Sequence, residues 1–239
     1  MYSEIASASE ERSSASLNSF RFRTANTDDL EFIIEAIIES EKSGAELIGT
    51  CLIFGISEEE YKNILAEVLM EDVGDYEYSF KGFLIAESND EYLGTSGSWI
   101  EKLDGVSSGI MKTSILTPYL SEQKIGEMRS NMNIINALTI PREPFAFQLE
   151  HIYIRKNFRN RGLFSILIKE NIKRNLTRYP FNKVQTILFD KNLASFYAHL
   201  KFGFEVIEKK AAADKEVLKY FPFDSKVLME LNKEKINRL

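Results

Sequence analysis

A basic turn in the C-terminal half of the chain is the part of the sequence best suited to bind an anion. A predicted strand, 147–154, precedes this turn, and a predicted helix, 162–177, follows it. A helix N-terminus presents unpaired N–H groups and a partial positive charge, and Gly162 permits a positive φ or a close backbone approach to a phosphate. These features predict a phosphate cradle, although an ordinary strand–turn–helix with a solvated basic face has the same pattern. The cations of the turn and helix are Arg155, Lys156, Arg159, Arg161, Lys169, Lys173, Arg174 and Arg178.

The sequence motifs that most strongly indicate other chemistries are absent from the chain. It has no GxxxxGK[ST] of a Walker loop, no GxGxxG of a dinucleotide-binding fold and no GxSxG nucleophile elbow. His151, His199 and a single cysteine make no metal-ligand set of suitable spacing, so we expect no metal. Cys51 lies in an apolar stretch and is expected to be a buried small hydrophobe rather than a nucleophile.

Length and composition are those of an ordinary globular protein of 239 residues, 44% hydrophobic, with a net charge of -6. The single cysteine cannot form an internal disulfide, and residues 1–16 lack the pattern of a secretory signal, so we expect a cytoplasmic protein. No apolar run reaches the roughly 18 residues of a membrane span, and the net acidity disfavours nucleic acid as a partner. The basic segment 155–178 nevertheless holds eight cations against Glu170 alone, which predicts a small anionic ligand.

Hydrophobic periodicity predicts strands and helices that alternate along most of the chain. The Ser/Glu-rich residues 1–19 are expected to be a flexible arm, and 20–239 a single domain with an insertion near 105–145. The expected strands are 20–24, 82–87, 92–94, 147–154, 183–189, 204–208 and 226–231. The expected helices are 30–38, 57–70, 111–119, 122–137, 162–177 and 192–201, the second of them opened by a capping box of Ser57 and Glu60.

Two segments together resemble the signatures of the GNAT (Gcn5-related) N-acetyltransferase superfamily. Arg159-Asn160-Arg161-Gly162-Leu163-Phe164 is similar to its Q/R-x-x-G-x-G/A motif, with Phe164 where the motif has Gly or Ala. The run 192–204 resembles the second motif, N-x-x-A/S-x-x-x-Y/H-x-x-x-G-F, through Asn192, Ser195, His199, Gly203 and Phe204. The resemblance extends over 147–208, is loose over 20–100 and is absent from 1–19 and 105–145. Phe164 must point into the core if its backbone N–H is to remain available.

The resemblance implies a binding site for acetyl-CoA, the acyl-donor co-substrate. In the family the strand before the loop splays from the next strand, and its backbone pairs with the pantetheine arm; the corresponding residues here are Ile152, Tyr153 and Ile154. The pyrophosphate is expected on the backbone of Arg159, Asn160, Arg161, Gly162, Leu163, Phe164 and Ser165. Asn192 corresponds to the family's asparagine near the acyl arm.

The resemblance also implies direct attack of an amine on the thioester, with a base and an acid supplied by the protein. Glu150 is the candidate base, because a carboxylate in an apolar strand would have a raised pKa; the alternative is a strand Glu paired with an Arg or facing water. His199 stands at the family's usual acid position, and Tyr197, about 200° round the helix, is the other candidate. At most one of these two side chains can face the thiolate, and a third possibility is that neither is the acid.

The expected surroundings of the acceptor are less well specified. Strict strand alternation places His151 on the sheet face opposite Glu150, in a core or surface role. The insertion 105–145 is expected to border the acceptor site. Glu35, Glu39 and Glu41 could attract a cationic acceptor, or form a solvated helix face.

The sequence therefore predicts an α+β fold: a GNAT-like mixed, mostly antiparallel six- to seven-stranded sheet with helices on both faces. The expected function is acyl, most simply acetyl, transfer from acetyl-CoA to a small-molecule or peptide amine acceptor in a ternary complex. The alternatives are a non-catalytic acyl-CoA-binding sensory or assembly module, and a scaffold that has lost the cofactor. A homodimer is possible on this evidence, and no nucleic-acid or membrane partner is expected.

Overall fold

A computed structural model describes residues 20–71, 73, 74 and 76–239. The expected arm, 1–19, lies outside the described residues, so the division into arm and domain stays a prediction. Within the described part of the chain, no helix is long and apolar enough to cross a membrane.

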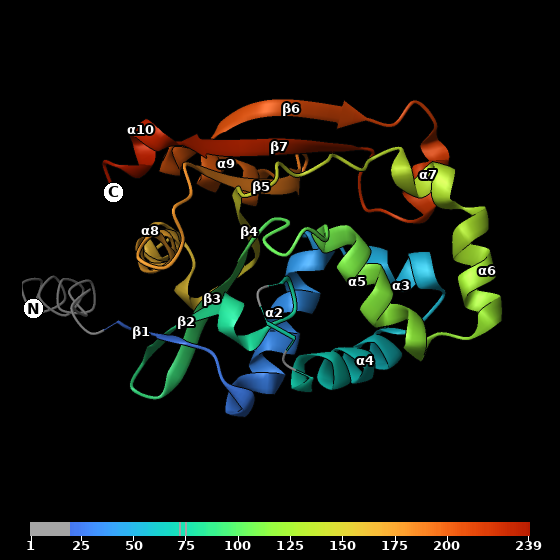
Figure 1. Ribbon diagram of the computed structural model, residues 1–239, viewed down its shortest axis with the longest axis horizontal. Coiled ribbons are helices and arrows are strands. Elements are labelled where there is room, and N and C mark those ends of the chain that lie inside the picture. Colours follow the sequence, from blue (N-terminus) through green and yellow to red (C-terminus); the bar gives the residue numbers. More distant parts are fainter. Residues whose placement is uncertain (1–19, 72, 75) are drawn as a thin grey trace, which may run out of the picture.

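Seven strands form one sheet in the order β1-β2-β3-β4-β5-β7-β6 (Figure 1). The pair β4–β5 is parallel and every other neighbouring pair is antiparallel, which confirms the predicted mixed, mostly antiparallel sheet. The strands are β1 (Arg21–Thr24), β2 (Phe83–Ser88), β3 (Glu91–Ile100), β4 (Phe147–Ile154), β5 (Lys183–Phe189), β6 (Glu205–Ala211) and β7 (Ser225–Asn232).

Helices cover both faces of the sheet, as the sequence predicted (Figure 1). Alternation along β2 shows the two layers: Phe83 and Ile85 pack with α2 and α4, whereas Leu84 and Ala86 pack with α8. The helices are α2 (Leu30–Lys42), α3 (Gly49–Phe54), α4 (Glu58–Met70), α5 (Ser108–Leu116), α6 (Glu122–Ser130), α7 (Met132–Asn136), α8 (Leu163–Leu176), α9 (Leu193–Phe202) and α10 (Lys233–Ile236).

Local sequence signals account for most of these elements. The capping box of Ser57 opens α4, with the hydroxyl accepting from Glu60 N–H and the Glu60 carboxylate accepting from Ser57 N–H. Strand β3 extends to Ile100, although only 92–94 was expected. Its residues 93–100 are all buried, and several of them are small or polar, so this strand has no alternation to detect. Helix α3 was not predicted; it is a six-residue helix around the buried Cys51.

The insertion between β3 and β4 holds α5, α6 and α7 and joins two parts of the core. Leu116 and Met128 are buried in the same cluster as α2 and α4. Leu138 lies in a second cluster with Phe189 and Phe221, near the ends of β5 and β7. The insertion therefore covers the α2 side of the sheet from α4 across to β5 and β7, and we call this side the insertion-facing side.

Strand β4 changes direction in its second half. It pairs with β5 only at Phe147↔Val184 and Gln148↔Gln185. A bulge interrupts its pairing with β3, and His151 has a left-handed φ of 48° at this point. The expectation that His151 and Glu150 face opposite sides of the sheet is wrong: the extra residue turns His151 to the α2 side, where Glu77 contacts it.

Candidate functional site

The loop between β4 and α8 has a backbone arranged to hold an anion. Asn160 and Gly162 have left-handed φ values of 61° and 77°, and such residues help to gather successive N–H groups into a concavity. Among the described residues, none accepts a hydrogen bond from the N–H groups of 160–164. Arg159 N–H and Ser165 N–H are used within the loop, donating to Lys156 O and Gly162 O. The five unpaired donors stand at the positive end of α8.

Phe164 does not cover this loop. Its ring packs edge-on against His199, with 5.0 Å between the ring centroids, and against Phe202 at 6.5 Å. These partners belong to α9, and the surrounding cluster also contains Ile168 and Ile172 of α8. The bulky side chain at the Gly/Ala position of the motif therefore fills the interface between two helices, and the backbone N–H of Phe164 stays at the loop.

Beyond Gln148, strand β4 has no ladder to β5 in the described structure. The two strands diverge there, while β5 keeps its pairing with β7 on its other edge as far as Phe189. The segment Ile152–Ile154 lies in this divergent half, as the resemblance implies for a pantetheine-binding strand. Arg159 Nε donates to Ile154 O at 2.8 Å, so this carbonyl already has a protein partner.

Side chains around the loop hold the strand and the basic turn to α2. Tyr153 hydroxyl donates to Glu35 at 2.8 Å, and burial with this bond raises the pKa of Tyr153 to about 12. Arg155 forms an ion pair with the same carboxylate at 3.0 Å and lies over the ring of Phe32. The Glu35 carboxylate is therefore already bonded to Tyr153 and Arg155. This does not support the expectation that Glu35 attracts a cationic acceptor.

Glu150 is half-buried and forms an ion pair with Arg142 of the insertion, at 2.7 Å. Arg142 in turn lies over the ring of Trp99, 5.2 Å from its centroid. The predicted base is thus not alone in an apolar strand, the condition from which its raised pKa was inferred. It stands where the insertion meets the half of β4 that diverges from β5.

The two candidate acids lie in different environments on α9. His199 is buried, with 2% exposed, and burial lowers its pKa to about 4. Its Nδ1–H donates to Ser195 O at 2.8 Å, so Nε2 carries the lone pair in the neutral ring, and Nε2 has no partner among the described residues. Tyr197 is 60% exposed. Asn192 caps the helix by accepting from Ser195 N–H.

A buried ionic cluster lies beside this site that the sequence did not predict. His151 Nε2–H donates to Glu77 at 3.0 Å, and Lys112 of the insertion reaches Glu77 at 3.1 Å and Glu41 at 3.3 Å. Tyr61 hydroxyl donates to Glu41 at 2.8 Å. Glu41 is therefore not part of a solvated helix face, and periodicity missed the cluster because its members come from α2, α4, α5, the segment before β2 and the bulge.

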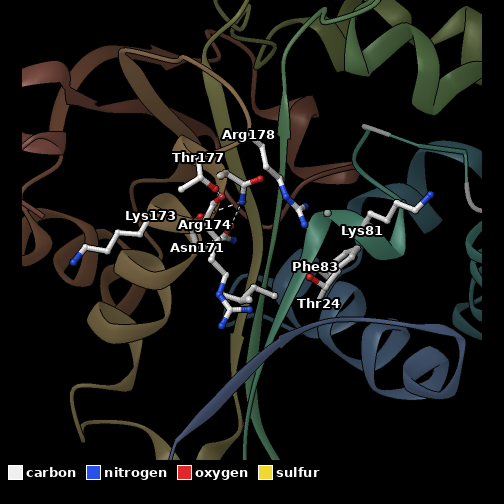
Figure 2. A pocket seen from close by; sticks show the side chains of 11 residues that line it. Thr24, Lys81, Phe83, Asn171, Lys173, Arg174, Thr177 and Arg178 are labelled. Atoms are coloured by element: carbon white, nitrogen blue, oxygen red, sulfur yellow. Dashed lines mark hydrogen bonds between the residues drawn. The ribbon is translucent and has the colours of Figure 1, made fainter.

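Two hollows of the described structure lie away from this loop. A groove of ≈ 430 Å³ lies at the opposite, C-terminal end of α8, and Figure 2 shows Arg178 reaching toward it while Lys81 and Lys173 extend away. An adjoining hollow of ≈ 500 Å³ shares Gly82, Asn175 and Arg178 with it. Helix α8 is about 20 Å long at 1.5 Å per residue, so this groove is remote from the loop.

No group of three or more His, Cys, Asp or Glu side chains in the described residues is arranged to hold a metal.

No protein-family profile matches the chain, and no curated protein matches its sequence. Solved structures do match it. An N-acetyltransferase from Staphylococcus aureus Mu50 has a TM-score of 0.58 at 13% identity, covering 88% of this chain and all of that one. A GNAT-family acetyltransferase from Streptococcus pneumoniae has a TM-score of 0.50 at 17% identity, covering 89% and 98%. The chain has the GNAT fold.

A third structure with the GNAT fold is similar over most of its length. The putative acetyltransferase yncA from Salmonella typhimurium, solved with its cofactor acetyl-CoA, has a TM-score of 0.51 at 14% identity and covers 90% of this chain and 95% of that one. At these identities the similarity concerns the fold alone.

Proposed function

We propose that the protein transfers an acyl group, most simply acetyl, from a CoA thioester to an amine. The observation that carries the proposal is the row of five unpaired N–H groups, 160–164, at the N-terminus of α8 and beside a strand that diverges from its neighbour. Neutral backbone donors with a helix dipole suit a pyrophosphate. The structural similarity to an acetyltransferase solved with acetyl-CoA supports the same ligand.

The residues present fit such a ligand. The thioester, when bound, supplies an activated acyl group. The 160–164 backbone would hold the pyrophosphate, Arg161 and Lys156 are exposed cations able to meet a further phosphate, and the free edge of Tyr153 and its neighbours would pair with the pantetheine amides. Asn192, already engaged as a helix cap, would contact the acyl arm only if its amide nitrogen points there.

Glu150 is the residue we assign to removal of the ammonium proton, directly or through water. It lies at the start of the divergent half of β4, and Arg142 fixes its position at 2.7 Å. Arg142 occupies one of the two carboxylate oxygens that could accept the proton. The role therefore needs the pair to loosen when the acceptor binds.

Protonation of the thiolate is assigned to His199 or Tyr197. The bond to Ser195 O places the proton of neutral His199 on Nδ1, so a proton on Nε2 as well requires the imidazolium, which burial disfavours. Tyr197 carries a donatable proton but is exposed. Loss of turnover in His199→Phe with Tyr197→Phe unaffected assigns the acid to His199, the reverse result assigns it to Tyr197, and no effect of either variant means that neither is the acid.

The alternative function is an acyl-CoA-binding module without transferase activity. It is favoured by two observations, the Arg142 ion pair of Glu150 and the absence of a proton on His199 Nε2. The experiment that separates the two functions measures thiol release from acetyl-CoA with amines, polyamines and peptides. Amine-dependent release supports the transferase, whereas CoA binding without release across the panel supports the module.

A further inference from the structure

Lys226, at the start of β7, is a cation without a counter-ion. Its Nζ lies 4.8 Å from the ring centroid of Phe189 and 4.7 Å from that of Phe221. The side chain is only partly exposed, and among the described residues no oxygen accepts a hydrogen bond from it and no carboxylate pairs with it. Two aromatic faces stabilise an ammonium group but supply no negative charge.

The side chain belongs to the same side of the sheet as the proposed base. Along β7 the residues Val227, Met229 and Leu231 pack in the cluster that includes α8, so Lys226 points to the other, insertion-facing side. Glu150 is on that side, through its ion pair with the insertion. Strand β5 lies between them: Lys226 of β7 is opposite Phe189 of β5, and Glu150 of β4 lies two residues beyond the last β4–β5 pair, Gln148↔Gln185.

Four charged side chains that act electrostatically on this lysine, Glu150, Arg142, Lys112 and Glu41, already have charged partners. Arg142 holds Glu150, and Lys112 holds Glu41 and Glu77. Burial is the main reason that the pKa of Lys226 falls to about 8. The cations Arg142 and Lys112 also lower it, while Glu150 and Glu41 oppose the shift without forming a bond. Lys226 thus lies on the same side of the sheet as the proposed base and has no partner of opposite charge among the described residues.

We propose that Lys226 binds a carboxylate of the acceptor, so that the substrate class is an amine that also carries a carboxylate, such as an amino acid. The inference rests on the proposed function and names the acceptor of that same site. One unpaired ammonium balances one negative charge. Its cross-strand neighbour, Lys210, already donates to the backbone carbonyls of Asn136 and Thr139. This arrangement favours a carboxylate over a phosphate, which needs more donors. The rings of Phe189 and Phe221 would pack against the acceptor's apolar part.

Matched amines test the proposal. Phenylalanine and 2-phenylethylamine, and leucine and 3-methylbutylamine, differ by one carboxylate. We expect kcat/KM to be at least about tenfold higher for the carboxylated member of each pair, and Lys226→Met to remove this preference while leaving the carboxylate-free amines unchanged. Lys226→Arg should retain most of the preference. Lys209→Met, which removes an exposed lysine paired with Asp190, is the control and should change neither.

Three results would overturn the proposal. The first is that the wild-type protein has the same kcat/KM for both amines of each pair. The second is that Lys226→Met, shown to be folded by its melting temperature, loses the same factor in kcat/KM for both amines of a pair. A higher kcat/KM for phosphoethanolamine than for the amino acids would show a phosphate site instead.

The failure of the proposed function is distinguishable from these results. If CoA binds and no amine is acetylated, the transferase fails, and the lysine is then tested by calorimetric titration of phenylalanine into the CoA complex. The carboxylate site would be supported if Lys226→Met weakens phenylalanine binding about tenfold and Lys209→Met leaves it unchanged. No binding, or equal binding in both variants, would overturn it.

Discussion

At the scale of single residues, the proposed chemistry depends on whether Glu150 can leave its ion pair. Its carboxylate is oriented by Arg142, which is itself held over Trp99. The sequence identified Glu150 by its position in the strand, but could not identify Arg142, because the two residues meet only through the fold of the insertion. The contact between Phe164, which departs from the motif, and His199, which matches it, is of the same kind, with 5.0 Å between the ring centroids.

We expect Glu150→Gln to lower turnover about 100-fold and to leave CoA affinity unchanged, because the amide keeps the shape of the carboxylate but accepts no proton. Steady-state kinetics and calorimetric titration with CoA measure the two quantities. Glu143→Gln is the matched control, since Glu143 is also an insertion-side carboxylate, paired with Lys183 at 2.6 Å. Equal turnover in the two variants would remove Glu150 from the mechanism.

The buried cluster also makes stability depend on pH through its two carboxyl groups, Glu41 and Glu77, whose pKa values are both lowered. Burial alone would raise the pKa of Glu77, but the Lys112 charge and the His151 bond outweigh it, and the folded protein holds this pKa well below its ordinary value. When the pKa of a carboxyl group is lower in the folded protein than in the unfolded chain, the charged group stabilises the fold. This contribution is complete above the pKa of the unfolded chain, about 4.3 for Glu, and it is lost as the pH falls below that value. We therefore expect the free energy of unfolding to fall as pH is lowered below about 5.

Urea titrations between neutral and acid pH test this expectation. The Glu77→Gln variant should be less stable than the wild-type protein at pH 7 and should show a shallower decline toward acid. An identical slope in the two proteins would mean that other carboxyls control the acid transition.

At the scale of elements, the loop before α8 is the part that the sequence specified best. Gly162, the basic turn and the helix lie where the pattern placed them, since a helix N-terminus and a left-handed glycine are local properties. The bulge in β4 was not predictable, because its extra residue is visible only in the register against β3. The same bulge brings His151 into the buried cluster and accompanies the divergence of β4 from β5.

Gly162→Ala should weaken CoA binding about tenfold or more, since an added Cβ strains the backbone at φ 77° and shifts the N–H groups of the loop. Gly105→Ala is the control: it has a φ of 90°, and like Gly162 it has no atom within 4 Å of the added Cβ. Both changes should cost roughly 1 kcal/mol of stability, but the control should bind CoA normally. Equal CoA affinity in both variants would place the anion elsewhere.

At the scale of the whole molecule, the insertion adds charged contacts on the insertion-facing side of this GNAT fold. Lys112 from α5 and Arg142 from the segment before β4 both reach carboxylates of the insertion-facing side. The sequence located the insertion near 105–145 but specified neither contact, because the partners are far apart along the chain. The strands and helices of 147–208 were predicted closely, since their periodicity is regular and their ends carry cap residues.

We expect Lys112→Met to destabilise the protein by about 3 kcal/mol, because it leaves Glu41 and Glu77 buried without their shared cation. Urea unfolding at pH 7 measures the loss. Lys219→Met removes an exposed lysine paired with Glu216 and should change stability by less than about 0.5 kcal/mol. A similar small effect in both variants would show that the cluster does not hold the insertion to the core.

The claim that an acyl-CoA binds at the N-terminus of α8 is tested most directly by titrating CoA into the protein, followed by calorimetry and by the shift in melting temperature. We predict saturable one-site binding that acetyl-CoA competes for, with a matching rise in melting temperature. The absence of both a binding isotherm and a melting shift at millimolar CoA would contradict the account.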